Sequence, residues 1–329
     1  MLNPKYKLNQ KIFDQDAETN STRVGYGEGL IVLGEKNPDV VVLTADLSDS
    51  TKTEGFAKKF GDRFFDCGVA EQNMVAVAAG LAEAGKIPFV SSYATFSPGK
   101  NWETIRTTVV YNRANVKIAG HHSGVMTGPD GATHQATEDI ASVRSWPGLN
   151  IIVPADNIEA KKATIVAGET EGPFYLRFSR DKSVIMTTDE TPFEFGKLAD
   201  FWISENPQVT IFAMGYMTYY ALVAAYELEK EGIETLVINV ATIKPFDTSG
   251  MLEFVEKSRA AVTVEDHQIM GGLGGVVAEN LAKTMPLPME FVGLQDTFAE
   301  SGKPNELLAK YHMDVVNIKE AVKRVIKRK

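Results

Sequence analysis

Short runs of β-branched and aromatic residues alternate along this chain with longer segments of helical period, and this alternation limits the possible folds more than any other feature. The first series of runs lies at residues 40–45, 63–67, 87–92, 116–120, 150–155 and 174–179. Strands that are separated by helices form parallel sheets with helices on both faces. The sequence therefore predicts an α/β fold built on a parallel sheet.

The alternation stops near residue 180 and resumes near residue 208. The segment between, "SRDKSVIMTTDETPFEFGKLADFW", carries Pro, Gly and scattered charges, which favour a linker with room for a hairpin. Further runs at 208–215, 235–240, 260–266 and 289–294 predict a second, smaller α/β domain. The chain has 329 residues, roughly twice the length of a typical domain. We expect these parts: a first domain at 1–187, a linker at 188–206 and a second domain at 207–329.

Charge and composition exclude several classes of protein. The net charge of −9 argues against nonspecific binding to nucleic acid, which requires Lys and Arg to neutralise phosphates. No run of about 18 apolar residues predicts a membrane span. The single cysteine, Cys67, excludes an internal disulfide framework, and the first residues lack the apolar core of a signal peptide. We expect a cytoplasmic protein that binds neither nucleic acid nor membranes.

One acidic residue, Glu71, begins a helical segment whose following residues are nearly all apolar or small, in "EQNMVAVAAGLAEAG". This pattern is typical of a helix that is buried on all sides. The ordinary explanation of an acidic residue in a first turn is the helix dipole. A carboxylate at the head of a buried helix nevertheless costs free energy unless another group pairs with it or protonates it. That cost indicates a functional role for Glu71.

The loop "GHHSGVMTGPDGATHQ" follows a predicted strand and holds three of the five histidines. The carboxyl ends of parallel strands are where α/β folds bind ligands. His121, His122, Asp130 and His134 offer two interpretations: hydrogen bonds to a polyhydroxylated or phosphorylated substrate, or a metal site. A simple solvated loop is a third. Because no cysteine pair or HExxH motif supports a metal, we favour the substrate.

Several sequence blocks occur here in the order found in one enzyme family. They are "GVAEQNM", the pair Thr95–Phe96, the histidine loop continuing into "PGLNIIVPAD", and "LRFSRD". Over its whole length the chain resembles the C-terminal half of transketolase, a pyrimidine-binding domain followed by a C-terminal domain. The resemblance implies transfer of a two-carbon ketol unit from a ketose phosphate to an aldose phosphate with thiamine diphosphate, as in the pentose phosphate pathway.

The resemblance also implies which residues meet the cofactor. Glu71 matches the glutamate that hydrogen-bonds the aminopyrimidine ring of thiamine diphosphate and so activates it. Phe96 matches the aromatic residue that stacks on that ring, and Asp46 matches an aspartate near the cofactor. Trp102 stands near a tyrosine of the family's pocket, although the segment "TFSPGKNWETIR" is slightly shorter than the family spacing.

The resemblance also implies which residues contact the sugar substrate. Three residues match the positions that hold the phosphate of the substrate: Arg23, Ser50 and Arg180. The planar guanidinium of arginine suits phosphate because it meets two oxygens at once. Three more match residues around the sugar: His122 and Asp130 at its hydroxyls and His134 near the reacting centre. We expect the two histidines to be catalytic, orienting hydroxyls and passing protons.

Two features of the family pattern lack a counterpart. His121 matches no family position. The "GDG" element and the Asn-rich end that hold Mg²⁺ and the diphosphate do not occur, since "GPDG" at 128–131 has the wrong spacing. The resemblance therefore implies a split transketolase. A second polypeptide, the N-terminal subunit, would hold Mg²⁺ and the diphosphate, in an α2β2 heterotetramer.

Three other assignments compete with this one. The β subunit of a 2-oxo-acid dehydrogenase has a similar length, the same domain order and an activating glutamate. Deoxyxylulose-phosphate synthase is a further relative, usually a single long chain. A non-catalytic partner subunit is the alternative from a different class. The loop "DGATHQ" and the arginines favour sugar chemistry, and a bystander has no need to keep Glu71, Phe96 and the histidines.

Overall fold

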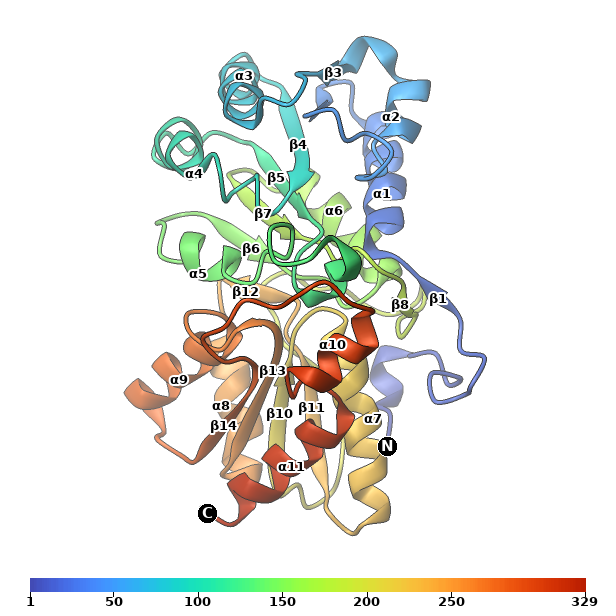
Figure 1. Ribbon diagram of the computed structural model, residues 1–329, viewed down its shortest axis with the longest axis vertical. Coiled ribbons are helices and arrows are strands. Elements are labelled where there is room, and N and C mark those ends of the chain that lie inside the picture. The colour runs from blue at the N-terminus through green and yellow to red at the C-terminus, as the bar shows by residue number, and fades with distance from the viewer.

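The computed structural model describes residues 1–329 and contains two sheets, one above the other (Figure 1). The predicted fold class, two α/β domains with mainly parallel sheets, is confirmed. The first sheet has the strand order β12-β6-β7-β5-β4-β2-β3. Its strands are β2 (Val40–Thr44), β3 (Phe64–Asp66), β4 (Ile87–Tyr93), β5 (Lys117–His121), β6 (Asn150–Ile152), β7 (Phe174–Arg177) and β12 (Thr242–Lys244). All neighbours pair in parallel except β12, which runs antiparallel to β6 and comes from the second half of the chain.

Helices cover both faces of the first sheet. One face packs against α1 (Thr22–Lys36) and α6 (Asn157–Glu169). The other packs against α3 (Glu71–Glu83), the π-helix η3 (Ile105–Val110) and α5 (Asp139–Val143). Short elements complete this half: α2 (Glu54–Lys59), α4 (Trp102–Thr104), the 3₁₀ helices η2 (Gly61–Arg63) and η4 (Val125–Asp130), and the strand pair β1 (Thr19–Asn20) and β8 (Ser183–Val184).

The start of α1 is held close to α6 because α1 carries glycine at the contact. A Cβ atom on Gly25 would lie 1.8 Å from the carbonyl oxygen of Asn157, so no larger residue fits there. The Ser21 side chain caps the helix by accepting a hydrogen bond from the backbone N–H of Arg23. This packing places Arg23 at the carboxyl edge of the sheet.

The second sheet has the strand order β14-β13-β10-β11-β9. Its strands are β9 (Ala199–Trp202), β10 (Val209–Ala213), β11 (Thr235–Asn239), β13 (Ala261–Gln268) and β14 (Met289–Leu294). Helices α7 (Met217–Lys230) and α11 (Val315–Ile326) pack on one face, and α8 (Thr248–Ser258) and α9 (Leu273–Thr284) on the other. Helix α10 (Pro304–Lys310) lies near the first domain (Figure 1).

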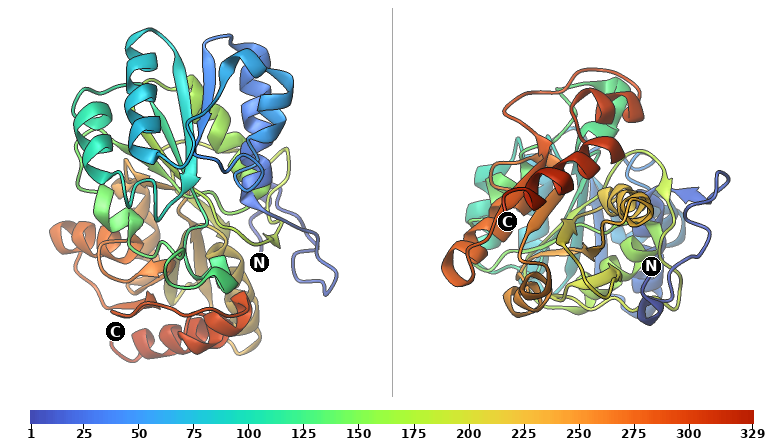
Figure 2. Two further views of the ribbon diagram at one scale, coloured as in Figure 1. Left: turned by 45° about the horizontal axis from the view of Figure 1, so that its top comes forward. Right: turned by 90° about the horizontal axis from the view of Figure 1, so that it is seen from below.

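Two parts of the chain pack differently from the predicted division. The segment 188–206, predicted as a linker, contains β9, which is the antiparallel edge strand of the second sheet. Residues 1–17, predicted within the first domain, pack on the second. The N–H of Asn3 donates to the carbonyl of Phe201 at 2.9 Å, and Phe13 stacks on Tyr226 with ring centroids 4.5 Å apart. Figures 1 and 2 place the N terminus, which includes η1 (Pro4–Tyr6), beside α7.

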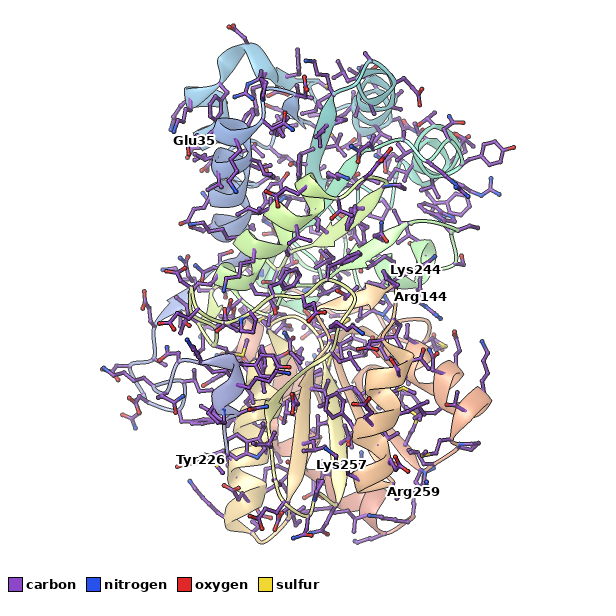
Figure 3. All side chains as sticks on the ribbon, turned by 180° about the vertical axis from the view of Figure 1, so that it is seen from behind. Glu35, Arg144, Tyr226, Lys244, Lys257 and Arg259 are labelled. Atoms are coloured by element: carbon purple, nitrogen blue, oxygen red, sulfur yellow. The ribbon has the colours of Figure 1, made fainter.

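The two domains share a continuous apolar core as well as a polar junction. One cluster of buried side chains runs from Val41 and Tyr175 in the first domain to Phe212 and Leu273 in the second. At the edge of the junction Lys244 lies beside Arg144 and donates to its carbonyl oxygen at 2.9 Å (Figure 3). In the whole chain no helix combines the length and apolar character that crossing a membrane requires.

Candidate active site

The carboxylate of Glu71 lies at the head of α3 with 2 % of its surface exposed. The Nζ atom of Lys100 contacts its Oε2 atom at 3.0 Å. The side-chain amide of Asn101 donates to the Glu71 backbone carbonyl at 3.2 Å. These contacts tie the segment 96–101 to the start of the helix. Two polar atoms in this region, Oγ1 of Thr95 and Oδ1 of Asn101, are buried without a hydrogen-bond partner.

Helix α3 is buried on one side only, so the prediction that it is buried all round is wrong. Met74, Val75 and Ala78 pack into the core, whereas Val77 and Ala76 face outward and Val77 is 40 % exposed. The apolar outer side lacks a covering element within this chain. We call the exposed apolar residues around it the α3 surface: Phe65, Val69, Val77, Trp102 and Tyr111.

Four rings form a cluster at the carboxyl end of β4. Tyr93, the last residue of β4, stacks on His122 with ring centroids 3.8 Å apart, and also on Phe96 at 5.8 Å. His134 meets the edges of Phe96 at 5.5 Å and of Tyr93 at 6.0 Å. Phe96 belongs to the segment that is tied to Glu71. The cluster therefore joins the predicted cofactor residues to the predicted sugar residues.

His122 is held as a neutral imidazole. Its backbone is in the left-handed region, with φ of 55°, and its carbonyl accepts a hydrogen bond from the Thr127 hydroxyl at 2.6 Å. Burial, followed by the positive charges of Arg23 and Arg180 and by His134, lowers the pKa of His122 to about 3. A neutral imidazole can orient a polar ligand by hydrogen bonding, but near neutral pH it carries no cationic proton to donate.

The predicted phosphate residues come together from three separate segments. Arg23 donates from Nη1 to the backbone carbonyl of Ser50 at 2.6 Å, and no carboxylate forms an ion pair with it. Arg180 donates to the Thr127 carbonyl at 2.9 Å, and its Nη2 lies 3.7 Å from Asp130. Both arginines line a pocket of about 610 Å³. Burial, followed by the charge of Arg180, lowers the pKa of Arg23.

The other predicted residues lie around this site in different ways. Asp46 follows β2 with φ of 59° and is exposed. Trp102 donates from its indole to the Ser142 carbonyl at 3.0 Å and packs on Trp146, so the structure gives it partners other than Phe96.

His121 lies in the core between Tyr26 and Phe178, with neither ring nitrogen bonded to protein. Burial, followed by His122 and Arg23, lowers its pKa well below the ordinary value, so it is neutral. No group of three or more His, Cys, Asp or Glu side chains is arranged to hold a metal ion. The alternative of a metal site in the histidine loop therefore finds no support in the arrangement of His121, His122, Asp130 and His134.

Sequence reasoning missed the residues of the second domain that hold the histidine loop. Asp266 of β13 is buried and accepts hydrogen bonds from the Val125 N–H at 2.8 Å and from the Tyr216 hydroxyl at 2.5 Å. A Cβ atom on Gly124 would lie 1.8 Å from this carboxylate, which explains the glycine. The sequence signal that could have revealed Asp266 was the acidic pair in "VEDHQ", at the end of an apolar strand. Tyr93, an aromatic residue at a strand end, was also missed.

A buried ion pair fastens the other end of the loop. Arg177 donates from Nε to Asp139 at 2.8 Å and from Nη2 to the carbonyls of Ala136 and Asp266. Burial alone would raise the pKa of Asp139, but Arg177, His267 and hydrogen bonds, including one from Tyr175, outweigh it and hold this pKa below its ordinary value. The contact of Arg177 with the Asp266 carbonyl also links this end of the loop to the second domain.

Comparisons with known proteins identify both domains. The family described as "Transketolase, pyrimidine binding domain" matches residues 18–186, and "Transketolase, C-terminal domain" matches residues 202–318. A transketolase C-terminal section from Methanocaldococcus jannaschii is 44 % identical over 310 residues, covering 93 % of this chain and 96 % of that protein. A 6-deoxy-6-sulfo-D-fructose transketolase subunit from a Clostridium species is 35 % identical, covering 96 % of this chain and 98 % of that protein.

A solved structure is similar as well. The structure titled "Split gene transketolase, inactive beta4 tetramer" is 43 % identical and superposes with a TM-score of 0.87, covering 93 % of this chain and 98 % of that chain. Both domain matches and these relatives span nearly the whole sequence. The chain therefore belongs to the transketolase family and is a subunit that carries its pyrimidine-binding and C-terminal domains.

Proposed function

We propose that this chain transfers a two-carbon ketol unit from a ketose phosphate to an aldose phosphate, in complex with a subunit that supplies the diphosphate-binding domain. The observation that carries the proposal is the buried Glu71 carboxylate, tied to the segment of Phe96, whose ring cluster extends to His122 and so to the neighbouring Arg23 and Arg180. A cofactor-activating acid and an anion pocket on one continuous site are what ketol transfer between sugar phosphates requires.

The residues around Glu71 fit the pyrimidine end of thiamine diphosphate. Unpartnered oxygens of Thr95 and Asn101 offer acceptors for an amino group, and the Phe96 ring is partly exposed. When bound, the cofactor supplies a stabilised carbanion for cleavage of the bond next to the ketose carbonyl. Glu71 would hold a proton at the pyrimidine ring, after its contact with Lys100 is released. The histidine loop would hold the sugar, with His122 and Asp130 at its hydroxyls, His134 near the reacting atoms and the arginines with Ser50 at its phosphate.

The diphosphate end and Mg²⁺ are assigned to the partner subunit. The α3 surface is the proposed contact with that subunit, because it lies beside Glu71 and is apolar and uncovered. Two copies of each chain, in an α2β2 heterotetramer, would cover both such surfaces.

The relatives narrow the substrate class without naming a sugar. One relative is named for 6-deoxy-6-sulfo-D-fructose and another for apulose 4-phosphate. Both names describe a sugar with an anionic end. We propose that this chain also takes sugars with an anionic end, which Arg23 and Arg180 would bind. The pentose phosphate pathway and a cytoplasmic location stay predictions from the sequence.

One reconstitution assay tests the proposal. The chain is mixed with a candidate partner subunit, Mg²⁺, thiamine diphosphate, a ketose phosphate and an aldose phosphate. Two-carbon transfer is expected. Release of carbon dioxide from a 2-oxo acid would instead identify a dehydrogenase β subunit. If neither reaction occurred with any partner tested, the chain would be a non-catalytic subunit. Tight binding of the diphosphate by the chain alone would contradict the assignment of that end of the cofactor to a partner.

A further inference from the structure

The second domain forms one wall of the arginine pocket. The pocket of about 610 Å³ is lined by Arg23, Pro129, Arg180, Asp181, Gly302, Lys303, Pro304 and Glu306. The last four residues lie at the start of α10, more than 100 residues beyond the first domain in sequence. Three lining residues are cations and two are acids, and Asp130 lies 3.7 Å from Arg180.

The segment that carries Lys303 is packed firmly against the histidine loop. The Gly302 N–H donates to the Gly128 carbonyl at 3.4 Å. The Gln135 side-chain amide donates to the Glu300 carbonyl at 3.1 Å and to the Gly128 carbonyl at 3.3 Å. A Cβ atom on Gly131 would lie only 2.5 Å from the Ser301 hydroxyl. The backbone of Lys303 is therefore a fixed part of the pocket wall, while its side chain is free to move.

The present partner of Lys303 is easily exchanged for a ligand. Its Nζ lies 3.3 Å from Glu306, and the two side chains are 83 % and 68 % exposed. Exposed ion pairs of this kind contribute little free energy. Arg23 forms no ion pair with a carboxylate, and Arg180 forms one long ion pair, with Asp130 at 3.7 Å. The pocket thus holds three cations whose pairing is incomplete, two from the first domain and one from the second.

We propose that Lys303 completes a three-cation subsite, with Arg23 and Arg180, for the terminal phosphate of the sugar substrate, and that it is a specificity-determining residue. This inference rests on the proposed function and deepens it by assigning the second domain a direct part in substrate choice. An ammonium group on a flexible stem adjusts to phosphates at the end of sugars of different length, whereas the two guanidinium groups are fixed by backbone contacts.

Two measurements on Lys303→Ala test the subsite. In the first, the isolated full chain is titrated calorimetrically with ribose 5-phosphate, inorganic phosphate and unphosphorylated ribose. In the second, the reconstituted complex is assayed with ribose 5-phosphate and with unphosphorylated glycolaldehyde as acceptors. Loss of one charged contact to phosphate should weaken binding and raise KM for ribose 5-phosphate about three- to tenfold. We expect kcat, and KM for glycolaldehyde, to stay unchanged.

Three further variants sharpen the test. Lys303→Arg should retain binding within about twofold, since it keeps the charge. Glu306→Gln should tighten phosphate binding, because it removes the competing carboxylate. Lys257→Ala removes the same charge from an exposed position at the far end of the second domain (Figure 3) and should behave as wild type.

The outcomes separate the inference from the proposed function. Equal phosphate binding by Lys303→Ala and wild type, or no phosphate binding by wild type at millimolar concentrations, overturns the subsite. Weaker phosphate binding by Lys303→Ala but not by Lys257→Ala supports it. A complex that fails to transfer ketol units, while the isolated chain shows this binding difference, counts against the proposed function and leaves the subsite supported.

Discussion

Buried carboxylates lie both beside the α3 surface and at the domain junction, but only the junction is covered fully by this chain. At the junction Asp139 and Asp266 are enclosed, and the charged partner of Asp139, Arg177, is itself buried. At the α3 surface Glu71 is just as buried, yet its only side-chain partner is Lys100, which is half exposed. Five neighbouring apolar residues there face outward. The difference separates carboxylates that maintain the fold from the one that we propose acts on a ligand beside a partner subunit.

The comparison is tested most strongly by Glu71→Gln. Loss of a positioned proton-transfer group lowers rates by about 10²–10⁴-fold, and we expect a fall of this size in ketol transfer by the reconstituted complex. Stability of the isolated chain should change little, because Lys100 is free to turn into water. Glu83→Gln, at the exposed end of the same helix, is the control and should keep full activity. Normal turnover by Glu71→Gln would remove the role assigned to this carboxylate.

Asp139→Asn is the matching change at the junction. It leaves the buried Arg177 without a counter-charge, which costs about 3–5 kcal/mol in the free energy of unfolding. Urea unfolding of the isolated chain measures this. Glu190→Gln removes one partner of the exposed ion pair with Lys7 and should leave the midpoint of the urea transition unchanged. An unchanged urea transition in Asp139→Asn would show that this ion pair does not stabilise the fold.

Val77→Glu tests whether the α3 surface binds a partner. Val77 is 40 % exposed, so the chain should fold, while a charge at a buried interface centre should weaken assembly about 30-fold or more. Sedimentation of mixtures with the partner subunit gives the affinity. Val316→Glu, on the exposed side of α11, places the same charge on the second domain and should assemble normally. If both variants assembled alike, the partner would have to bind elsewhere.

Acid should destabilise the fold through both the ring cluster and the junction. The folded-state pKa of His122 is about 3, below the ordinary 6.5, so its contribution to stability is present above pH 6.5 and is lost as pH falls toward 3. The lowered pKa of Asp139 adds a loss in acid. An NMR titration of the histidines should show His122 neutral down to about pH 4, because its neighbours Arg23, Arg180 and His134 disfavour its charged form.

The Tyr93 ring stacks on His122, so its removal tests whether this cover lowers the His122 pKa. Tyr93→Ala uncovers the His122 ring, so the His122 pKa should rise toward its ordinary value, whereas Tyr93→Phe keeps the ring and should leave the pKa in place. A titration of His122 near pH 6.5 in the unaltered chain would contradict the buried, neutral imidazole.

Much of the fold followed from local pattern. The strands of both parallel sheets lie where β-branched runs predicted them, because a strand buried on both faces needs an unbroken apolar run. Strand β12, with three residues, and β9, among Pro and charges, were missed because tertiary pairing, and not their own composition, makes them strands. The predicted association of Arg23 with Arg180 agrees with the pocket, while the part played by Lys303 had no sequence signal.

The sequence by itself determined the order of elements, the family, and the residue types at the head of α3 and in the histidine loop, since each depends on neighbours along the chain. Only the tertiary structure decided which side of α3 stays uncovered, that Asp266 and Arg177 hold the histidine loop, and that Lys303 reaches the arginine pocket. Burial and charge pairing act through space, and the groups they bring together here are as much as 280 residues apart, from Arg23 to Lys303.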